Sequence, residues 1–356
     1  MNSTKLQPGN GYRIPRQAYY EQEWFDREQK LLFPASWNFV GTTTELSTPG
    51  AYISTCVGPY PIALVVGEDG VVRGFHNLCR HRGAKLLDGK GTCRTITCPY
   101  HRWQYSLDGS LNNVPQSADQ IPLLNTEDWG LKPVKIATWM GLIFVNPDGT
   151  APDFEIWIDR VPEFLDTYKL DQLTELDQIE YEFDANWKVY IENHIDWYHL
   201  WYVHAKTLRN LDHHAGKMHF LGPHFVSYDP YKNPDLEIPP FQPLKGLSEE
   251  SKSTGAHLLF PNLTLFSDSS WFGIGHITPI SPIRTRMSFR LFALPDQDPK
   301  KFFDMFHQVT QIEDAEAAAR IQATVQSPAF SVGPLTKDFE LAITRFHDYY
   351  LEKLSV

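Results

Sequence analysis

The residues best suited to chemistry form two Cys–His pairs in the first third of the chain. One residue separates Cys79 from His81, and sixteen residues later come Cys98 and His101. Two thiolates and two imidazoles from two loops predict a single metal site. Zinc accepts such a ligand set, but its loops usually carry paired cysteines, whereas each loop here offers one Cys and one His. The split favours a [2Fe–2S] cluster, with both thiolates on one iron and both imidazoles on the other.

A second set of residues has the spacing Asp196-x₂-His199-x₄-His204 and follows the sequence NWK of residues 186–188. The five-residue step between the two histidines turns about 140° further round an ideal helix. Joint ligation of one metal therefore requires a helix end, a kink or a π-bulge. Two histidines and one distant carboxylate form the facial triad of non-haem Fe(II) oxygenases, whose open face admits O₂ and substrate. Many histidines are only structural, so this set alone is the weaker signal.

Together, the two sets resemble the oxygenase (alpha) component of Rieske-type non-haem iron oxygenases. The sequences CRHRG of residues 79–83 and CPYH of residues 98–101 resemble the cluster loops of that family. The segment 186–204 resembles its catalytic domain, and the two regions occur in the family's order. The family includes aromatic-ring-hydroxylating dioxygenases and monooxygenases that act on choline, betaine and carnitine. Arg102 departs from the pattern, because many relatives carry Gly there.

The resemblance implies which residues bind the metals. It assigns the [2Fe–2S] cluster to Cys79, His81, Cys98 and His101. It assigns a mononuclear Fe(II) to His199, His204 and Asp314. The family commonly has a Glu-Asp pair with a Gln eight residues after the Asp, as Glu313, Asp314 and Gln322 have here. Glu313 is the competing ligand, and the other interpretation is that residues 313–316 are a solvated acidic helix start, which the helix dipole favours.

The resemblance gives Asp196 a catalytic role. In the family, this acidic residue bridges a cluster histidine of a neighbouring subunit to an iron histidine, and a carboxylate that accepts an imidazole N–H also fixes the ring's tautomer. Carnitine-type relatives carry Glu there, which disfavours that substrate. We expect His194 to lie outside the pocket, and His213 and His214 to lie in a solvated loop. The residues expected to line the pocket are Trp201, Tyr202, Phe266, Trp271 and Phe272.

The implied function is that of an oxygenase component which hydroxylates or demethylates a small aromatic compound or quaternary amine. It would use O₂ and electrons from a separate NAD(P)H-dependent reductase, directly or through a ferredoxin. The chain has no G-x-G-x-x-G segment after a strand, so nothing suggests that it binds the nicotinamide itself. The resemblance implies a homotrimer and leaves mono- and dioxygenase outcomes open. The alternatives are a stand-alone Rieske electron-transfer protein and a zinc-bound structural protein.

The elements that must position these residues indicate an α+β fold. Short strand-like runs from 37 to about 147, separated by turn residues, predict an all-β module. We expect a Rieske domain at 36–150, inserted near the start of a helix-grip-like catalytic domain that comprises 1–35 and 151–356. The other segments are predicted as helices at 17–33, 159–171, 299–325 and 336–353, strands at 257–266, 271–279 and 286–294, an irregular region at 222–245 and a lid or entry loop at 210–245.

Composition narrows the class of protein. A chain of 356 residues suggests two domains. A formal net charge of −11 without a basic run argues against nucleic acid or an anionic membrane as partner. No apolar run reaches the length of a membrane span, and the first residues lack a signal-peptide pattern. Four cysteines are too few for a disulfide framework in so long a chain, so we expect a reducing cytoplasm.

Overall fold

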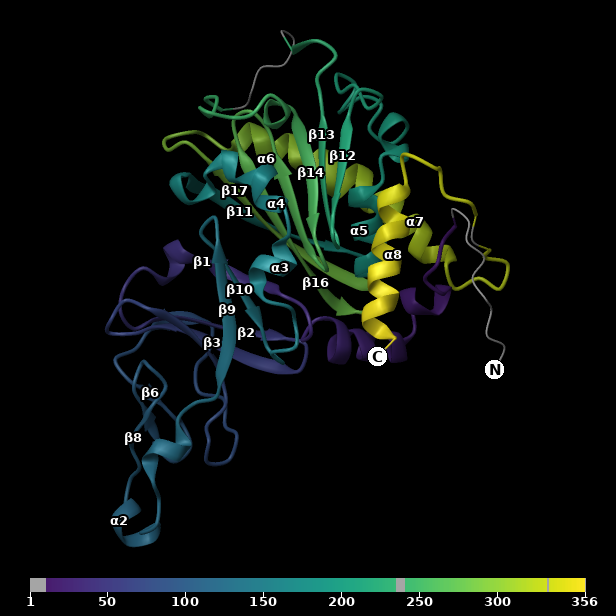
Figure 1. The fold of residues 1–356 in the computed structure, drawn as a ribbon. Coiled ribbons are helices and arrows are strands. Elements are labelled where there is room, and N and C mark those ends of the chain that lie inside the picture. The colour runs from purple at the N-terminus through teal and green to yellow at the C-terminus, as the bar shows by residue number, and fades with distance from the viewer. Residues whose placement is uncertain (1–10, 235–240, 332, 356) are drawn as a thin grey trace. The chain divides into compact units, whose positions relative to one another are not determined.

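The computed structural model describes residues 11–234, 241–331 and 333–355. The chain divides into two compact units, and Figure 1 follows them by colour along the chain. One unit comprises Gln29–Phe154, and the other joins the chain up to Glu28 to the segment that begins at Glu155. The expected α+β class is confirmed. The domain bounds expected from the sequence stay a prediction.

Antiparallel strands make up most of the regular secondary structure of the Gln29–Phe154 unit. A seven-stranded sheet has the order β1-β10-β9-β4-β3-β2-β5, and a three-stranded sheet has the order β6-β7-β8. The apolar runs of the sequence form the interior, since all five residues of Leu142–Asn146 are buried. The strands are β1 Asn38–Thr42, β2 Ala51–Val57, β3 Tyr60–Val66, β4 Val72–His76, β5 Lys90–Thr92, β6 Ile96–Thr97, β7 Gln104–Tyr105, β8 Leu111–Asn113, β9 Pro133–Trp139 and β10 Leu142–Asn146. The one α-helix within it is α2, Ser117–Gln120.

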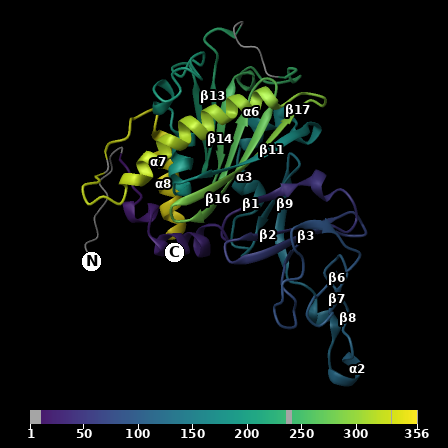
Figure 2. The ribbon, with the colours of Figure 1, turned by 180° about the vertical axis from the view of Figure 1, so that it is seen from behind.

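The larger unit has one seven-stranded antiparallel sheet, in the order β11-β17-β16-β15-β14-β13-β12. Its strands are β11 Thr174–Phe183, β12 Lys217–Leu221, β13 His224–Asp229, β14 Thr254–Leu259, β15 Leu263–Ser267, β16 Phe272–Ser281 and β17 Arg284–Ala293. Its helices are α1 Gln22–Arg27, α3 Phe154–Ile158 (which begins on the last residue of the other unit), α4 Val161–Leu165, α5 Trp187–Ile195, α6 Lys300–His307, α7 Ala315–Thr324 and α8 Leu341–Leu354. Figure 2 shows α6 and α7 lying across one face of the sheet.

Aromatic packing holds α6 against the sheet. Phe302 and Phe306 are one helical turn apart on α6, so they share a face. The ring of Phe306 stacks on Phe289 of β17 with 4.0 Å between centroids, and Phe302 meets the edge of Trp271 at 4.7 Å. These contacts fix the helix that leads to Asp314.

Several predicted elements differ from the structure. The expected strand 257–266 is two strands, β14 and β15, joined by a tight turn at 260–262. The region 222–245 was wrongly predicted as irregular throughout, because β13 lies within it and pairs with β12 and β14. Part of the expected lid, residues 235–240, lies outside the described residues. Among the described residues, no helix is both long enough and apolar enough to cross a membrane.

Candidate metal centres and substrate cavity

The two Cys–His loops share one backbone design. In the first loop, the Gly83 N–H donates to the Cys79 carbonyl at 2.9 Å, and in the second the Arg102 N–H donates to the Cys98 carbonyl at 3.2 Å. Each cysteine N–H in turn donates to a carbonyl five residues later, at 2.8 Å in both loops. Both closing residues have left-handed backbones, with φ of 72° at Gly83 and 62° at Arg102. Arg102 therefore occupies a position whose conformation favours glycine.

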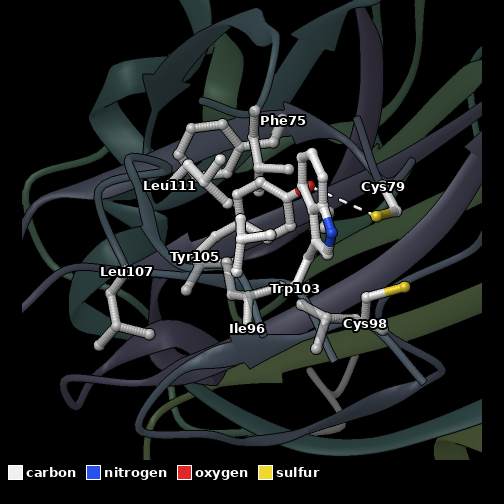
Figure 3. Packing of buried hydrophobic residues seen from close by; sticks show 13 residues of the cluster. Phe75, Cys79, Ile96, Cys98, Trp103, Tyr105, Leu107 and Leu111 are labelled. Carbon is white, nitrogen blue, oxygen red and sulfur yellow. Dashed lines mark hydrogen bonds between the residues drawn. The ribbon is translucent and has the colours of Figure 1, made fainter. Parts of the chain in front are cut away.

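The cysteines of these loops are buried, whereas their histidines are more accessible, with His101 only partly buried. Cys79 and Cys98 are 3% and 1% exposed, and His81 is exposed. Figure 3 shows both sulfur atoms at the edge of the packed side chains, with the Tyr105 hydroxyl reaching Cys79. Burial is the largest cause of the raised pKa of the Cys79 thiol, and the adjacent Cys98 thiol adds to it.

The two imidazoles of the loops lie side by side. The ring centroids of His81 and His101 are 4.7 Å apart, and His81 stacks on Trp103 at 5.0 Å. Two buried sulfurs beside a pair of more accessible rings suit the donor set of a Rieske [2Fe–2S] cluster, in which imidazoles replace two thiolates on one iron.

Helix α5 starts from a buried, hydrogen-bonded anchor. The Asn186 side chain accepts from the Lys188 N–H at 3.0 Å and caps the helix. The Lys188 ammonium lies 2.5 Å from the Glu28 carboxylate, and both side chains are completely buried. The Trp187 indole and the Tyr350 hydroxyl also donate to Glu28. Because Glu28 accepts from all three groups, this buried ion pair fixes the start of the helix.

The helix end, and not a π-bulge, brings the two motif histidines together. Helix α5 stops at Ile195, His199 lies in a 3-10 turn at Tyr198–Trp201, and His204 lies in the bend that follows. Ligand atoms of His199, His204 and Asp314 all lie within 4.8 Å of one another. The Nε2 atoms of His199 and His204 lie 3.6 Å and 2.9 Å from Asp314 Oδ1. The structure thus brings together the three residues that the sequence suggested as a triad.

A carboxylate holds the far nitrogen of each histidine. Asp196 Oδ2 lies 3.0 Å from His199 Nδ1, and Glu313 Oε2 lies 2.6 Å from His204 Nδ1. Each Nε2 therefore faces Asp314, as a metal ligand with a fixed tautomer does. Glu313, the competing ligand in the sequence, lies behind His204 instead.

The electrostatics of the triad favour a cation. Burial opposes charge on His199, but the carboxylates of Asp196 and Asp314 outweigh it and raise the pKa of His199 to about 9. Burial also opposes charge on Asp314, yet His199 and His204 hold the pKa of Asp314 below its usual range. Two imidazoles and a carboxylate in this arrangement fit a divalent iron site.

A π-helical segment, Gln308–Asp314, delivers Asp314 to the site. It lies between α6 and α7 and interrupts the continuous α-helix that they would otherwise form. Wider helical turns of this kind often occur at functional sites. The Asn193 side chain donates to Asp314 Oδ1 at 2.9 Å. Gln322 accepts from the Asn186 N–H at 2.8 Å and so joins α7 to the start of α5.

A cavity of about 150 Å³ adjoins the triad. Its walls are mostly apolar and include Leu200, Leu208, Phe266, Trp271, Met305 and Phe306. Phe266 and Trp271 were expected there. Among the lining residues that the structure describes, Trp201, Tyr202 and Phe272 do not occur, so these three expectations were wrong.

Two histidines lie where the sequence interpretation did not put them. His194 lines the cavity, together with Tyr190 and Asn193. The sequence could have indicated that His194 lies with Tyr190 and Asn193, because the positions 190, 193 and 194 share one face of a helix. His213 is 4% exposed and pairs with Asp229, so it does not lie in solvent.

Comparisons with known proteins agree with this geometry. The family model described as "Ring hydroxylating alpha subunit (catalytic domain)" matches residues 170–355, and the "Rieske [2Fe-2S] domain" model matches 36–134. The glycine betaine monooxygenase oxygenase subunit of Chromohalobacter salexigens is 33% identical over 201 residues, 56% of this chain and 45% of that protein. The carnitine monooxygenase oxygenase subunit of Acinetobacter pittii is 33% identical over 198 residues, 54% of this chain and 52% of that protein.

These two matches span about half the length of the relatives concerned. Among solved structures, the quaternary ammonium Rieske monooxygenase CntA in complex with L-carnitine has a TM-score of 0.80 at 23% identity, covering 96% of this chain and 95% of that one. That likeness extends the agreement to the fold of nearly the whole chain.

Proposed function

The chain belongs to the ring-hydroxylating alpha-subunit family and carries a Rieske [2Fe–2S] domain, and on this premise we propose that it is the oxygenase component of a multicomponent Rieske oxygenase. It uses O₂ and electrons from a separate reductase to hydroxylate or demethylate a small organic substrate. The observation that carries the proposal is the triad of His199, His204 and Asp314, whose ligand atoms lie within 4.8 Å of one another beside an apolar cavity.

Each proposed ligand set matches the chemistry of its cofactor. Cys79, His81, Cys98 and His101 hold the cluster, and His199, His204 and Asp314 hold the iron. When bound, the iron supplies the activation of O₂. The residues of this chain orient the ligands, keep the Asp314 carboxylate ionised and surround the substrate with apolar walls that exclude water.

We assign Asp196 to the electron path. Its carboxylate lies 3.0 Å from Nδ1 of His199 and its side chain is 16% exposed, so a partner group can reach it from outside. A cluster histidine of a neighbouring subunit is the partner expected, in a homotrimer located in the cytoplasm. An NAD(P)H-dependent reductase, with or without a ferredoxin, supplies the electrons.

Metal content and oxygen consumption together test this proposal. We expect the purified protein to contain a reducible [2Fe–2S] cluster and one further iron per chain, and to consume O₂ with substrate and a surrogate reductase. The Asp314→Ala variant should lose the extra iron and O₂ consumption but keep the cluster. The control is Asp304→Ala on exposed α6 surface. A wild-type protein with a cluster but no further iron would instead be a stand-alone electron-transfer protein.

A further inference from the structure

Within the described part of the chain, the cavity lining offers no basic side chain to pair with a substrate carboxylate. Among the lining residues that the structure describes, none is Lys or Arg, and Asp314 is the sole carboxylate. Carnitine and glycine betaine each carry a carboxylate and a quaternary ammonium. A carboxylate buried without a positive or hydrogen-bonding partner is strongly disfavoured. The lining therefore disfavours a substrate that carries a carboxylate.

His194, one of the lining residues, has a fixed tautomer that leaves one ring nitrogen as a hydrogen-bond acceptor. His194 Nε2 lies 2.9 Å from the His257 carbonyl oxygen, which can only accept, so Nε2 must carry the proton. The ring is held edge to face against Phe266 at 4.8 Å. Burial lowers the pKa of His194 to about 4, so the ring is neutral and Nδ1 keeps its lone pair. No described residue donates a hydrogen bond to Nδ1.

The other polar groups of the lining are occupied or adaptable. The Thr254 hydroxyl bonds to Tyr231 and Asp268, and the Asn193 amide bonds to Asp314. The Thr310 hydroxyl can rotate to donate or accept. Nδ1 of His194 is a rigidly held acceptor of the lining, and it can be satisfied only by a donor.

From this lining we propose that the substrate is a ring-sized, mainly apolar molecule without a carboxylate and with one hydroxyl or N–H group, which donates a hydrogen bond to Nδ1 of His194. This inference rests on the proposed function. A cavity of about 150 Å³ matches the volume of cavities that bind benzene. His194 then selects and positions the substrate, because an analogue without the donor leaves a buried acceptor unpaired.

Phenol and toluene test the proposal, since they have nearly the same shape and only phenol is a donor. Their affinities are measured by calorimetry on metal-loaded enzyme without reductase, so the result does not depend on turnover. We expect wild type to bind phenol roughly fivefold to tenfold more tightly than toluene, the effect of one hydrogen bond. Carnitine and glycine betaine should bind more weakly than either.

The variant His194→Phe keeps an aromatic ring beside Phe266 but removes the acceptor. It should bind toluene more tightly than phenol and so reverse the preference, because the phenol hydroxyl then lacks an acceptor and toluene no longer leaves one unpaired. Equal binding of phenol and toluene by wild type, tighter binding of carnitine or glycine betaine, or an equal loss for both probes in the variant would overturn the proposal. Failure of the proposed function would appear separately, as missing iron or absent O₂ consumption.

Discussion

Glu313 lies behind His204, with 2.6 Å between Oε2 and Nδ1, while its neighbour Asp314 lies 2.9 Å from Nε2 of the same ring. Two consecutive carboxylates thus contact opposite nitrogens of one imidazole. Although burial acts against the charged form, hydrogen bonds from His204 and Thr207 hold the pKa of Glu313 below its usual range. An ionised Glu313 keeps His204 correctly oriented, with Nε2 toward the proposed metal.

The variant Glu313→Gln should weaken iron binding without affecting the cluster. Loss of such a supporting carboxylate typically lowers metal affinity about 10- to 100-fold. Iron retained after dialysis against a graded chelator measures the effect, with the visible absorption of the cluster as internal reference. Glu316→Gln is the matched control, because Glu316 is exposed and pairs with Arg320 on the surface. Equal iron retention in the two variants would contradict the role of Glu313.

The variant Asp196→Asn should keep both metal centres and lose turnover at least about tenfold. The amide retains the shape of the side chain but removes the charge beside His199 Nδ1. Product formation coupled to O₂ uptake measures the loss, and iron content shows that the site is intact. Asp184→Asn, at an exposed carboxylate, serves as the control. Full coupled turnover in Asp196→Asn would refute the electron-path assignment.

Substitutions at the two left-handed closing residues of the cluster loops should differ in their effect on the thermal stability of the cluster. Gly83→Ala should lower the midpoint of thermal cluster loss, because a Cβ at φ 72° costs about 1–2 kcal/mol. The added Cβ would meet no atom within 4 Å, so the backbone conformation alone is tested. Arg102→Gly should leave the midpoint unchanged or raise it, since it relieves the same strain at φ 62°. An equal decrease in both variants would disprove the conformational explanation.

Three histidines of the larger unit, His224, His257 and His276, should make its stability sensitive to acid. Burial lowers the pKa values of His224 and His276 to about 4 and of His257 to about 3. Below pH of about 6.5 the unfolded chain binds protons that the folded chain excludes. The free energy of unfolding should therefore fall as pH drops from about 6.5 toward 4, by about 1.4 kcal/mol per pH unit for each histidine.

Unfolding of metal-free protein at pH 7 and pH 5.5 measures this dependence. His224→Gln should reduce the pH dependence of the free energy of unfolding by the contribution of one histidine. The reason is that Gln keeps a donor for the Trp157 carbonyl but does not titrate. His214→Gln, at an exposed residue, should leave the dependence unchanged. The same pH dependence in all three proteins would rule out His224 as a source.

Residues that lie close together in the sequence could be interpreted from their types and spacing. The cluster loops and the segment 186–204 carry their ligands within short stretches, so spacing alone restricts the chemistry. The apolar runs that form β1, β2, β3, β4 and β10 were also evident, because alternation and turn residues are local signals. The strands β11, β12 and β13 were not predicted, although the alternation of apolar and acidic residues at 179–183 was a local signal for β11.

Only the tertiary structure decided the contacts between distant segments. Asp314 and Glu313 are chemically equivalent neighbours in the sequence, and the π-helical segment determines which of them faces the Nε2 atoms. His194 has no evident role in the sequence, and it gains one because the sheet and α6 enclose the face of α5 that bears it. The physical reason is the same in both cases. Residue type and spacing restrict what a side chain can do, but packing across a hundred residues determines which groups it meets.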